Sequence, residues 1–178
     1  MFTHGRLEEA LTKADRLMYM AKGHKNIVVT RWEQKQNTDK MEKRNLPQLL
    51  VVDDSEMNRE ILKEILGKEY RILEACDGEE ALKMLEQYGT EISLVLLDII
   101  MPKMDGFEVL AYMNRDKWIE DIPVIMISSE GSESYIRRAY ELGASDYISR
   151  PFDAKVVYQR VINMICLLYT SDAADDLT

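Results

Sequence analysis

The sequence predicts an α/β protein in which a five-stranded parallel sheet carries helices on both faces. Between residues 47 and 168 the chain alternates five times between a short apolar run and an amphipathic stretch. The main runs are apolar throughout rather than at every second residue, which is typical of parallel strands buried on both faces. With 178 residues, 46% of them hydrophobic, the chain can form one well-buried domain and an appendage.

The predicted strands are short segments rich in consecutive apolar residues. The second is the weakest and the fifth is the shortest. In chain order they are Leu49–Val52, Tyr70–Ala75, Ile92–Leu97, Pro123–Ile127 and Tyr147–Ile148. Because a helix follows each strand, neighbouring strands are expected to run parallel.

Each predicted strand precedes a stretch whose apolar residues recur at helical spacing. The first of these helices ends at Gly67 and is expected to turn five residues inward, namely Met57, Ile61, Leu62, Ile65 and Leu66. The other helices are predicted at Glu79–Tyr88, with Ala81, Leu82 and Leu85 inward, and at Asp105–Met113, Ser132–Leu142 and Asp153–Leu168.

The two ends of the chain fall outside this pattern. An apolar stripe over Leu7–Ala21 predicts a helix, Ile27–Val29 a short strand, and the polar residues 31–46 a linker. The amphipathic pattern stops after Leu168, and residues 169–178 offer nothing to bury. Two interpretations stay open for this tail. One is translated adapter sequence at the end of a metagenomic gene model, which we favour, and the other is a natural disordered tail.

The charge distribution argues against several classes of function. Residues 1–46 hold ten Lys/Arg and six Asp/Glu, a balance of +4, whereas residues 47–168 hold thirteen and twenty-three, a balance of −10. Nucleic acid needs a basic face, which this acidic segment does not offer. No stretch approaches the roughly 20 apolar residues of a membrane helix, and no signal-peptide core is present. The isolated Cys76 and Cys166 favour a reducing cytoplasm over a disulfide framework.

Polar residues follow four of the five predicted strands. Asp53 and Asp54 follow the first, Asp98 the third, Ser128 the fourth and Arg150 the fifth. In an open parallel sheet such positions meet at one edge, where functional groups collect. Three carboxylates placed together repel one another, and a hard cation such as Mg²⁺ resolves this repulsion. Each residue alone could be a helix cap, a turn residue or a surface charge, but their combination favours a functional cluster.

The predicted strand ends lie in four characteristic segments, LLVVDDSEMNRE, LVLLDIIMPKMDGFEVL, PVIMISS and GASDYISRPF. Segment by segment, these resemble the response-regulator receiver domain of two-component signalling. The resemblance implies a flavodoxin-like, doubly wound fold with strand order 2-1-3-4-5. It implies a regulatory domain, not an enzyme, in which Asp98 accepts a phosphoryl group from a histidine kinase or a phosphotransfer protein. Asp54 and Asp98 would bind Mg²⁺ directly, Asp53 through water, and Ile100 through its backbone carbonyl.

The resemblance also implies how phosphorylation would change the domain. Ser128 would hydrogen-bond the new phosphoryl group, and Tyr147 would move inward into the vacated space. The face made by the fourth helix, the fifth strand and the fifth helix would then change, and a homodimer through this face is one option. Three residues would shape the loops around the site: Pro102, Gly106 and Pro151, the last of them after a cis peptide bond.

Arg150 departs from the family pattern, which usually has lysine at this position. Lysine is a compact point charge, whereas the guanidinium is a longer planar fork that can still counter a phosphoryl oxygen. A pseudo-receiver that binds partners without being phosphorylated is therefore the alternative hypothesis. A haloacid-dehalogenase-like hydrolase also uses an Asp at a strand end, but it is disfavoured because it needs a second acid where Ile100 stands.

The N-terminal segment ALTKADRLMYMAKGHKNIVV contains a second recognisable pattern, formed by Ala14, Asp15, Met18, Tyr19, Ala21, Lys22 and Asn26. This pattern resembles the closing helix and strand of a GGDEF (diguanylate cyclase) domain, although the turn at Gly23 is a residue short. Any amphipathic helix is the alternative, and the catalytic GGDEF segment is absent from the chain. We therefore predict a cytoplasmic cyclic-di-GMP signalling protein with four parts: a GGDEF-like fragment at 1–30, a linker at 31–46, a receiver at 47–168 and the tail at 169–178.

Overall fold

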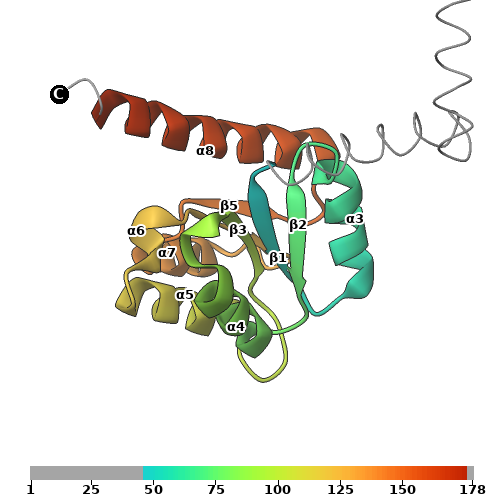
Figure 1. Cartoon of the computed structure of the whole chain (residues 1–178). Coiled ribbons are helices and arrows are strands. Elements are labelled where there is room, and N and C mark those ends of the chain that lie inside the picture. The colour runs from blue at the N-terminus through green and yellow to red at the C-terminus, as the bar shows by residue number, and fades with distance from the viewer. Residues whose placement is uncertain (1–45, 176–178) are drawn as a thin grey trace, which may run out of the picture. The chain divides into compact units, whose positions relative to one another are not determined.

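The sheet has five parallel strands in the order β2-β1-β3-β4-β5, which confirms the predicted fold and strand order (Figure 1). The computed structural model describes residues 46–175, so the helix, strand and linker predicted before residue 46 lie outside the described residues. The strands are β1 (Gln48–Val52), β2 (Arg71–Ala75), β3 (Ile92–Asp98), β4 (Val124–Ser128) and β5 (Asp146–Ser149).

Helices connect the strands and cover both faces of the sheet (Figure 1). They are α3 (Glu56–Leu66), α4 (Gly78–Tyr88), α5 (Gly106–Arg115), α7 (Glu133–Glu141) and α8 (Ala154–Asp175), with the short η1 (Gly89–Glu91) and α6 (Trp118–Asp121) between them. The short η1 and α6 were not predicted, because neither is long enough to show an amphipathic repeat. Between residues 46 and 175, no helix combines the length and the apolar character needed to cross a bilayer.

The core lies in two layers, one on each face of the sheet. Residues of α4, α5 and α7 pack on one face, and residues of α3 and α8 pack on the other. In β1, Leu50 and Val52 belong to the first layer, whereas Leu49 and Val51 belong to the second. Successive side chains of a strand point to opposite faces, so a strand covered on both sides has to be apolar throughout. Burial of each such side chain contributes roughly 1.5–3 kcal/mol.

Two residues of α3 do not face the core as predicted. Met57 is 73% exposed and Ile61 is 41% exposed, whereas Leu62 and Leu66 are buried. Neighbouring residues on a helix are about 100° apart, so the ridge of Met57 and Ile61 is turned away from the ridge of Leu62 and Leu66. The apolar arc of this helix is therefore wider than the stripe that the sheet and α8 cover.

The last helix continues beyond its predicted end. α8 runs past Leu168 to Asp175, so residues 169–175 continue the helix that the sequence pattern predicted to end at Leu168. Once a helix has formed, each further residue adds a hydrogen bond while only that residue is fixed, and Ala173 and Ala174 have the best helix propensity. The loss of the amphipathic pattern after Leu168 therefore does not mark the end of the helix.

Candidate functional site

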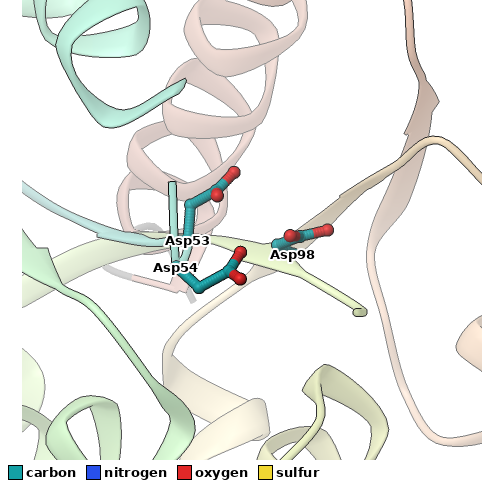
Figure 2. Close-up of side chains that lie close together, drawn as sticks. All are labelled: Asp53, Asp54 and Asp98. Carbon is teal, nitrogen blue, oxygen red and sulfur yellow. The ribbon is translucent and has the colours of Figure 1, made fainter. Parts of the chain in front are cut away.

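The polar residues predicted at the strand ends meet at the carboxyl edge of the sheet. Because β1 and β3 are neighbours, Asp53, which follows β1, lies beside Asp98, the last residue of β3. Asp53, Asp54 and Asp98 each offer a carboxylate oxygen, and these oxygens lie within 4.8 Å of one another (Figure 2). Ser128 ends β4, and its carbonyl accepts a 2.8 Å hydrogen bond from the amide of Arg150, which follows β5. The structure thus brings together the residues of all four strand ends.

Asp53 is buried and is held by the first turn of α3. Its Oδ1 accepts hydrogen bonds from the Ser55 amide at 2.8 Å and from Asn58 Nδ2 at 3.4 Å. Arg59 Nη1 donates to the Asp53 carbonyl at 2.7 Å. The side chain of Ser55 caps α3 by accepting from the Asn58 amide at 3.4 Å. Of the three residues Asp53, Asp54 and Ser55, the one that caps the helix is therefore Ser55. The side chain of Asp54 is exposed.

Asp98 is a buried carboxylate in surroundings that favour its protonated form. Burial, and after it the negative charge of Asp53, raise the pKa of Asp98 from its ordinary value of 3.8 to about 6. The positive charge of Arg150 opposes this shift. Near neutral pH the group is still mainly ionised, so Asp98 is a carboxylate held with less counter-charge than it needs. A cation beside it would relieve that imbalance.

Arg150 contacts two of the three carboxylates. Its Nη2 forms an ion pair with Asp53 Oδ2, and its Nη1 lies 3.9 Å from Asp98 Oδ2. The Arg150 side chain is 18% exposed, and its guanidinium carbon lies 6.0 Å from the centroid of the Phe152 ring. Its Nε is buried and has no hydrogen-bond partner within residues 46–175. The planar fork of an arginine reaches both carboxylates at once, which the single ammonium of a lysine does less readily.

The donor set fits a hard divalent cation. Three carboxylates and one guanidinium leave a formal charge of −2 when all are ionised, and one Mg²⁺ balances it. Carboxylate oxygens are ligands that Mg²⁺ prefers, and the ion keeps several waters, which the exposed Asp54 allows. Ile100 lies in the loop after Asp98 with an exposed side chain, and its backbone carbonyl stays a predicted ligand.

Ser128 and Tyr147 both bind the backbone of Glu130, in the loop after β4. The Ser128 Oγ accepts from the Glu130 amide at 3.2 Å, and the Tyr147 hydroxyl donates to the Glu130 carbonyl. Both side chains are buried, so Tyr147 already points inward in this structure. Burial is the main cause that raises the pKa of Tyr147, and the hydroxyl therefore stays a donor. Sequence analysis missed Glu130 because its contribution is made by the main chain.

Three residues predicted to shape the loops, Gly106, Pro102 and Pro151, have the following surroundings. A Cβ on Gly106 would lie 2.9 Å from the Asp98 carbonyl carbon and closer still to its oxygen, so only glycine fits there. The carbonyl of Pro102 accepts a 2.8 Å hydrogen bond from the Met104 amide, which turns the loop after β3. The peptide bond before Pro151 is cis, as predicted.

Asn58 and Arg59 contact Asp53 but were not predicted as site residues. Arg59 bridges two elements, since its Nε also pairs with Glu74 of β2 at 3.4 Å. Both residues lie in the first turn of α3, directly after the loop that carries Asp53 and Asp54. A signal was available, because polar residues in the first turn after a strand-end carboxylate are well placed to bind it.

Comparisons with known proteins identify the family of the domain that carries these residues. Residues 49–162 match the family described as the response regulator receiver domain. A probable cyclic di-GMP phosphodiesterase of Vibrio cholerae is 39% identical over 113 residues, which cover 64% of this chain and 25% of that protein. Response regulator RR06 of Streptococcus pneumoniae is 36% identical over 122 residues, which cover 68% of this chain and 54% of that protein. The chain thus corresponds to only a part of each relative.

Solved structures share the fold. The receiver domain of a putative LuxO repressor protein from Vibrio parahaemolyticus has a TM-score of 0.67 and 24% identity, covering 72% of this chain and 97% of that chain. A CheX–CheY complex with BeF₃ and Mg²⁺ from Borrelia burgdorferi has a TM-score of 0.61 and 35% identity, covering 68% and 96%. Since the family match covers most of the chain and includes the carboxylate cluster, this chain belongs to the response regulator receiver domain family.

Proposed function

We propose that Asp98 is the phosphoryl acceptor of this receiver domain. The observation that carries the proposal is the convergence of Asp53, Asp54 and Asp98, with a buried Asp98 at the end of the central strand β3. An oxygen of Asp98 would attack the phosphorus of a donor phosphohistidine. The P–N bond would break, the imidazole would leave with the electron pair, and an acyl phosphate would form on Asp98. The phosphorylated domain acts as a signal and turns over no substrate of its own.

The same carboxylates would hold Mg²⁺, with Asp54 and Asp98 as direct ligands, Asp53 through water and the Ile100 carbonyl completing the set. The bound ion would neutralise charge on the phosphoryl oxygens. The chain's own contribution is orientation, because the hydrogen bonds to Asp53 Oδ1 keep that carboxylate turned toward the cluster. The Borrelia CheY structure, which contains Mg²⁺, supports this assignment. Arg150 and Ser128 would bind the remaining phosphoryl oxygens.

The peptide unit of Glu130 supports a route from the phosphoryl group to the surface. When Ser128 turns to donate its hydroxyl to a phosphoryl oxygen, it releases the Glu130 amide that it now accepts from. The Glu130 carbonyl is bound by Tyr147, so the loop after β4 and the side chain of β5 respond together. Since Tyr147 is already buried, phosphorylation would stabilise an inward position that the unmodified domain samples, which is a shift of population.

The face that receives this signal consists of α7, β5 and α8. Asp146 of β5 connects the three elements, because its Oδ1 accepts from Tyr140 of α7 at 3.4 Å and from Arg160 of α8 at 2.8 Å. Arg160 also donates to the Tyr147 carbonyl at 3.2 Å. We propose that this face passes the signal on, with a homodimer as one arrangement, and that a histidine kinase or a phosphotransfer protein supplies the phosphoryl group.

We further propose that the chain comes from a cytoplasmic cyclic-di-GMP signalling protein. The proposed parts are a GGDEF-like fragment at 1–30, a linker at 31–46, the receiver at 47–168 and a tail at 169–178. The GGDEF-like motif supports this context, as does the Vibrio cholerae relative named a probable cyclic di-GMP phosphodiesterase, although this chain matches only 25% of that protein. The genomic reading frame that contains this chain is the direct test.

A pseudo-receiver is the second candidate, and Arg150 is the observation in its favour. The guanidinium engages Asp53 and approaches Asp98, which could keep both carboxylates from their chemistry. The two candidates are separated by incubating the chain with acetyl phosphate and Mg²⁺ and measuring the intact mass. We expect one added phosphoryl group on the natural chain and none on Asp98→Asn. Undiminished labelling of Asp98→Asn refutes the acceptor assignment, and an unlabelled natural chain favours the pseudo-receiver.

A further inference from the structure

Arg150 and a divalent cation depend on the same carboxylate oxygens. Oδ1 of Asp53 is already bound by the Ser55 amide and by Asn58, so Oδ2 is the oxygen left for a cation. That oxygen is the one paired with Nη2 of Arg150, while Nη1 lies 3.9 Å from Oδ2 of Asp98. A guanidinium is not deprotonated in proteins, so it cannot leave the pair by losing its charge.

We propose that Arg150 competes with the divalent cation for Asp53 and Asp98 and thereby sets the metal affinity of the site. This inference rests on the proposed function, because it assumes that Mg²⁺ binds at the three carboxylates. It assigns to Arg150 a positioning role that precedes any contact with a phosphoryl group. Metal binding would require the guanidinium to move away from Asp53 or to share that carboxylate with the ion and its waters.

The surroundings of Arg150 allow such a movement. The side chain is 18% exposed, so solvent reaches part of it, and the Phe152 ring offers a second contact for a cation. The Nε–H makes no hydrogen bond within the described residues, so a change of rotamer breaks few bonds. By contrast, the carboxylate of Asp53 is 1% exposed and is held by α3, so it cannot move to meet the ion elsewhere.

The size of the effect follows from charge. A unit positive charge a few ångströms from Mg²⁺ repels it and also neutralises one of its ligands. Removal of that charge is expected to tighten Mg²⁺ binding by about tenfold, which is modest for charges at this separation in a partly buried site. Lysine keeps the charge but contacts the carboxylates as a point and not as a fork, so its effect is expected to lie between those of arginine and of a neutral residue.

The test is a titration of the full chain with Mg²⁺ alone, followed by backbone amide NMR shifts at residues 53–55 and 98–100. Compared are the natural chain, Arg150→Met, Arg150→Lys and the control Arg115→Met. Arg115 is an exposed arginine at the far end of α5, where it pairs with Asp116 at 3.0 Å. We expect the Kd for Mg²⁺ to fall about tenfold in Arg150→Met, to fall less in Arg150→Lys, and to change by less than about twofold in the control.

The melting temperature with and without Mg²⁺ gives a second measurement, because Arg150 and Mg²⁺ are expected to weaken each other's contact with the carboxylates. This measurement needs no phosphodonor. Without Mg²⁺, Arg150→Met should lower the melting temperature, because Asp53 loses its buried partner. Saturating Mg²⁺ should raise the melting temperature of this variant more than that of the natural chain. If Arg150→Met does not fold, Arg150→Lys still decides the question through its Kd.

The outcomes separate this inference from the proposed function. Metal-induced shifts with an equal or weaker affinity in both Arg150 variants overturn the competition and leave the proposed metal site intact. The absence of shifts at residues 53–55 and 98–100 in every variant overturns the proposed metal site and the competition with it.

Discussion

Gly106 packs against the backbone of Asp98 so closely that no side chain fits between them. A Cβ built on Gly106 would lie 2.9 Å from the Asp98 carbonyl carbon. The N-terminus of α5 is thereby held directly against the end of β3, which carries Asp98, the proposed acceptor. This contact fixes the loop between them, which contains the predicted ligand Ile100.

Gly106→Ala should therefore destabilise the domain by about 2–4 kcal/mol, because the added methyl group meets backbone that can yield only by moving α5 or β3. Urea denaturation measures the loss. Gly131→Ala is the matched control, since a Cβ there meets Ser149 Oγ at an ordinary 3.5 Å, and it should change stability by less than about 1 kcal/mol. Equal effects of the two variants would contradict the close packing.

Asp98→Asn should stabilise the metal-free domain by about 1 kcal/mol at pH 7.5. The substitution removes a buried negative charge next to Asp53, in surroundings that raise the pKa of Asp98 to about 6 even though the positive charge of Arg150 opposes that shift. Denaturation in the presence of a chelator measures the effect. The control Asp54→Asn, at an exposed position, should change the free energy of unfolding less. A clear loss of stability in Asp98→Asn would show instead that the negative charge of Asp98 is well compensated in the folded domain.

Arg150→Lys should keep or increase phosphorylation by acetyl phosphate. The variant retains a positive charge for the phosphoryl oxygens and has the group that the family usually carries at this position. The measurement is the labelled fraction at equal times, determined by intact mass. In Arg150→Ala, phosphorylation should in addition have a weaker effect on Tyr147 and on the face of α7, β5 and α8. A complete loss of labelling in Arg150→Lys would mean that this chain depends on the guanidinium.

Tyr147→Phe should cost about 1 kcal/mol and should loosen the loop after β4. The ring stays buried, but the hydrogen bond from its hydroxyl to the Glu130 carbonyl is lost. Hydrogen exchange of the amides at residues 129–133 should become faster. The control variant is Tyr140→Phe, which removes a hydroxyl that lies 3.4 Å from Asp146 on the surface. Unchanged hydrogen exchange in Tyr147→Phe would argue against the coupling through Glu130.

A fragment of residues 45–168 should be as stable as the full chain to within about 1 kcal/mol. Within residues 46–175, the members of the two core layers lie between residues 49 and 165, and the fragment keeps every one of them. Chemical denaturation of both proteins decides the matter. A loss of several kcal/mol on trimming would show that the N-terminal segment is integral to the fold.

Sequence patterns predicted the fold well for segments that are buried on both sides, such as the central strands. The continuous apolar run of β1 required a covered sheet, and the structure places its residues in both core layers. Patterns were less informative where exposure depends on the width of contact between elements. Met57 and Ile61 have the same helical spacing as the buried residues of α3, and only the placement of α3 against the sheet leaves them exposed.

For the site, the sequence by itself determined the set of carboxylates, because strand ends in a parallel sheet share one edge and the chain order specifies which residues arrive there. The sequence also has glycine at position 106, and arginine at position 150, where the resemblance to receiver domains implies lysine. Only the tertiary structure decided the partners. The ion pair of Arg150 with Asp53 and the hydrogen bond from Tyr147 to the Glu130 carbonyl join residues from different parts of the chain. The contact of Ser128 with the Glu130 amide is local and depends on the path of the loop after β4. Their physical reason is side-chain rotamers and loop paths that are set by packing, which periodicity along a sequence does not encode.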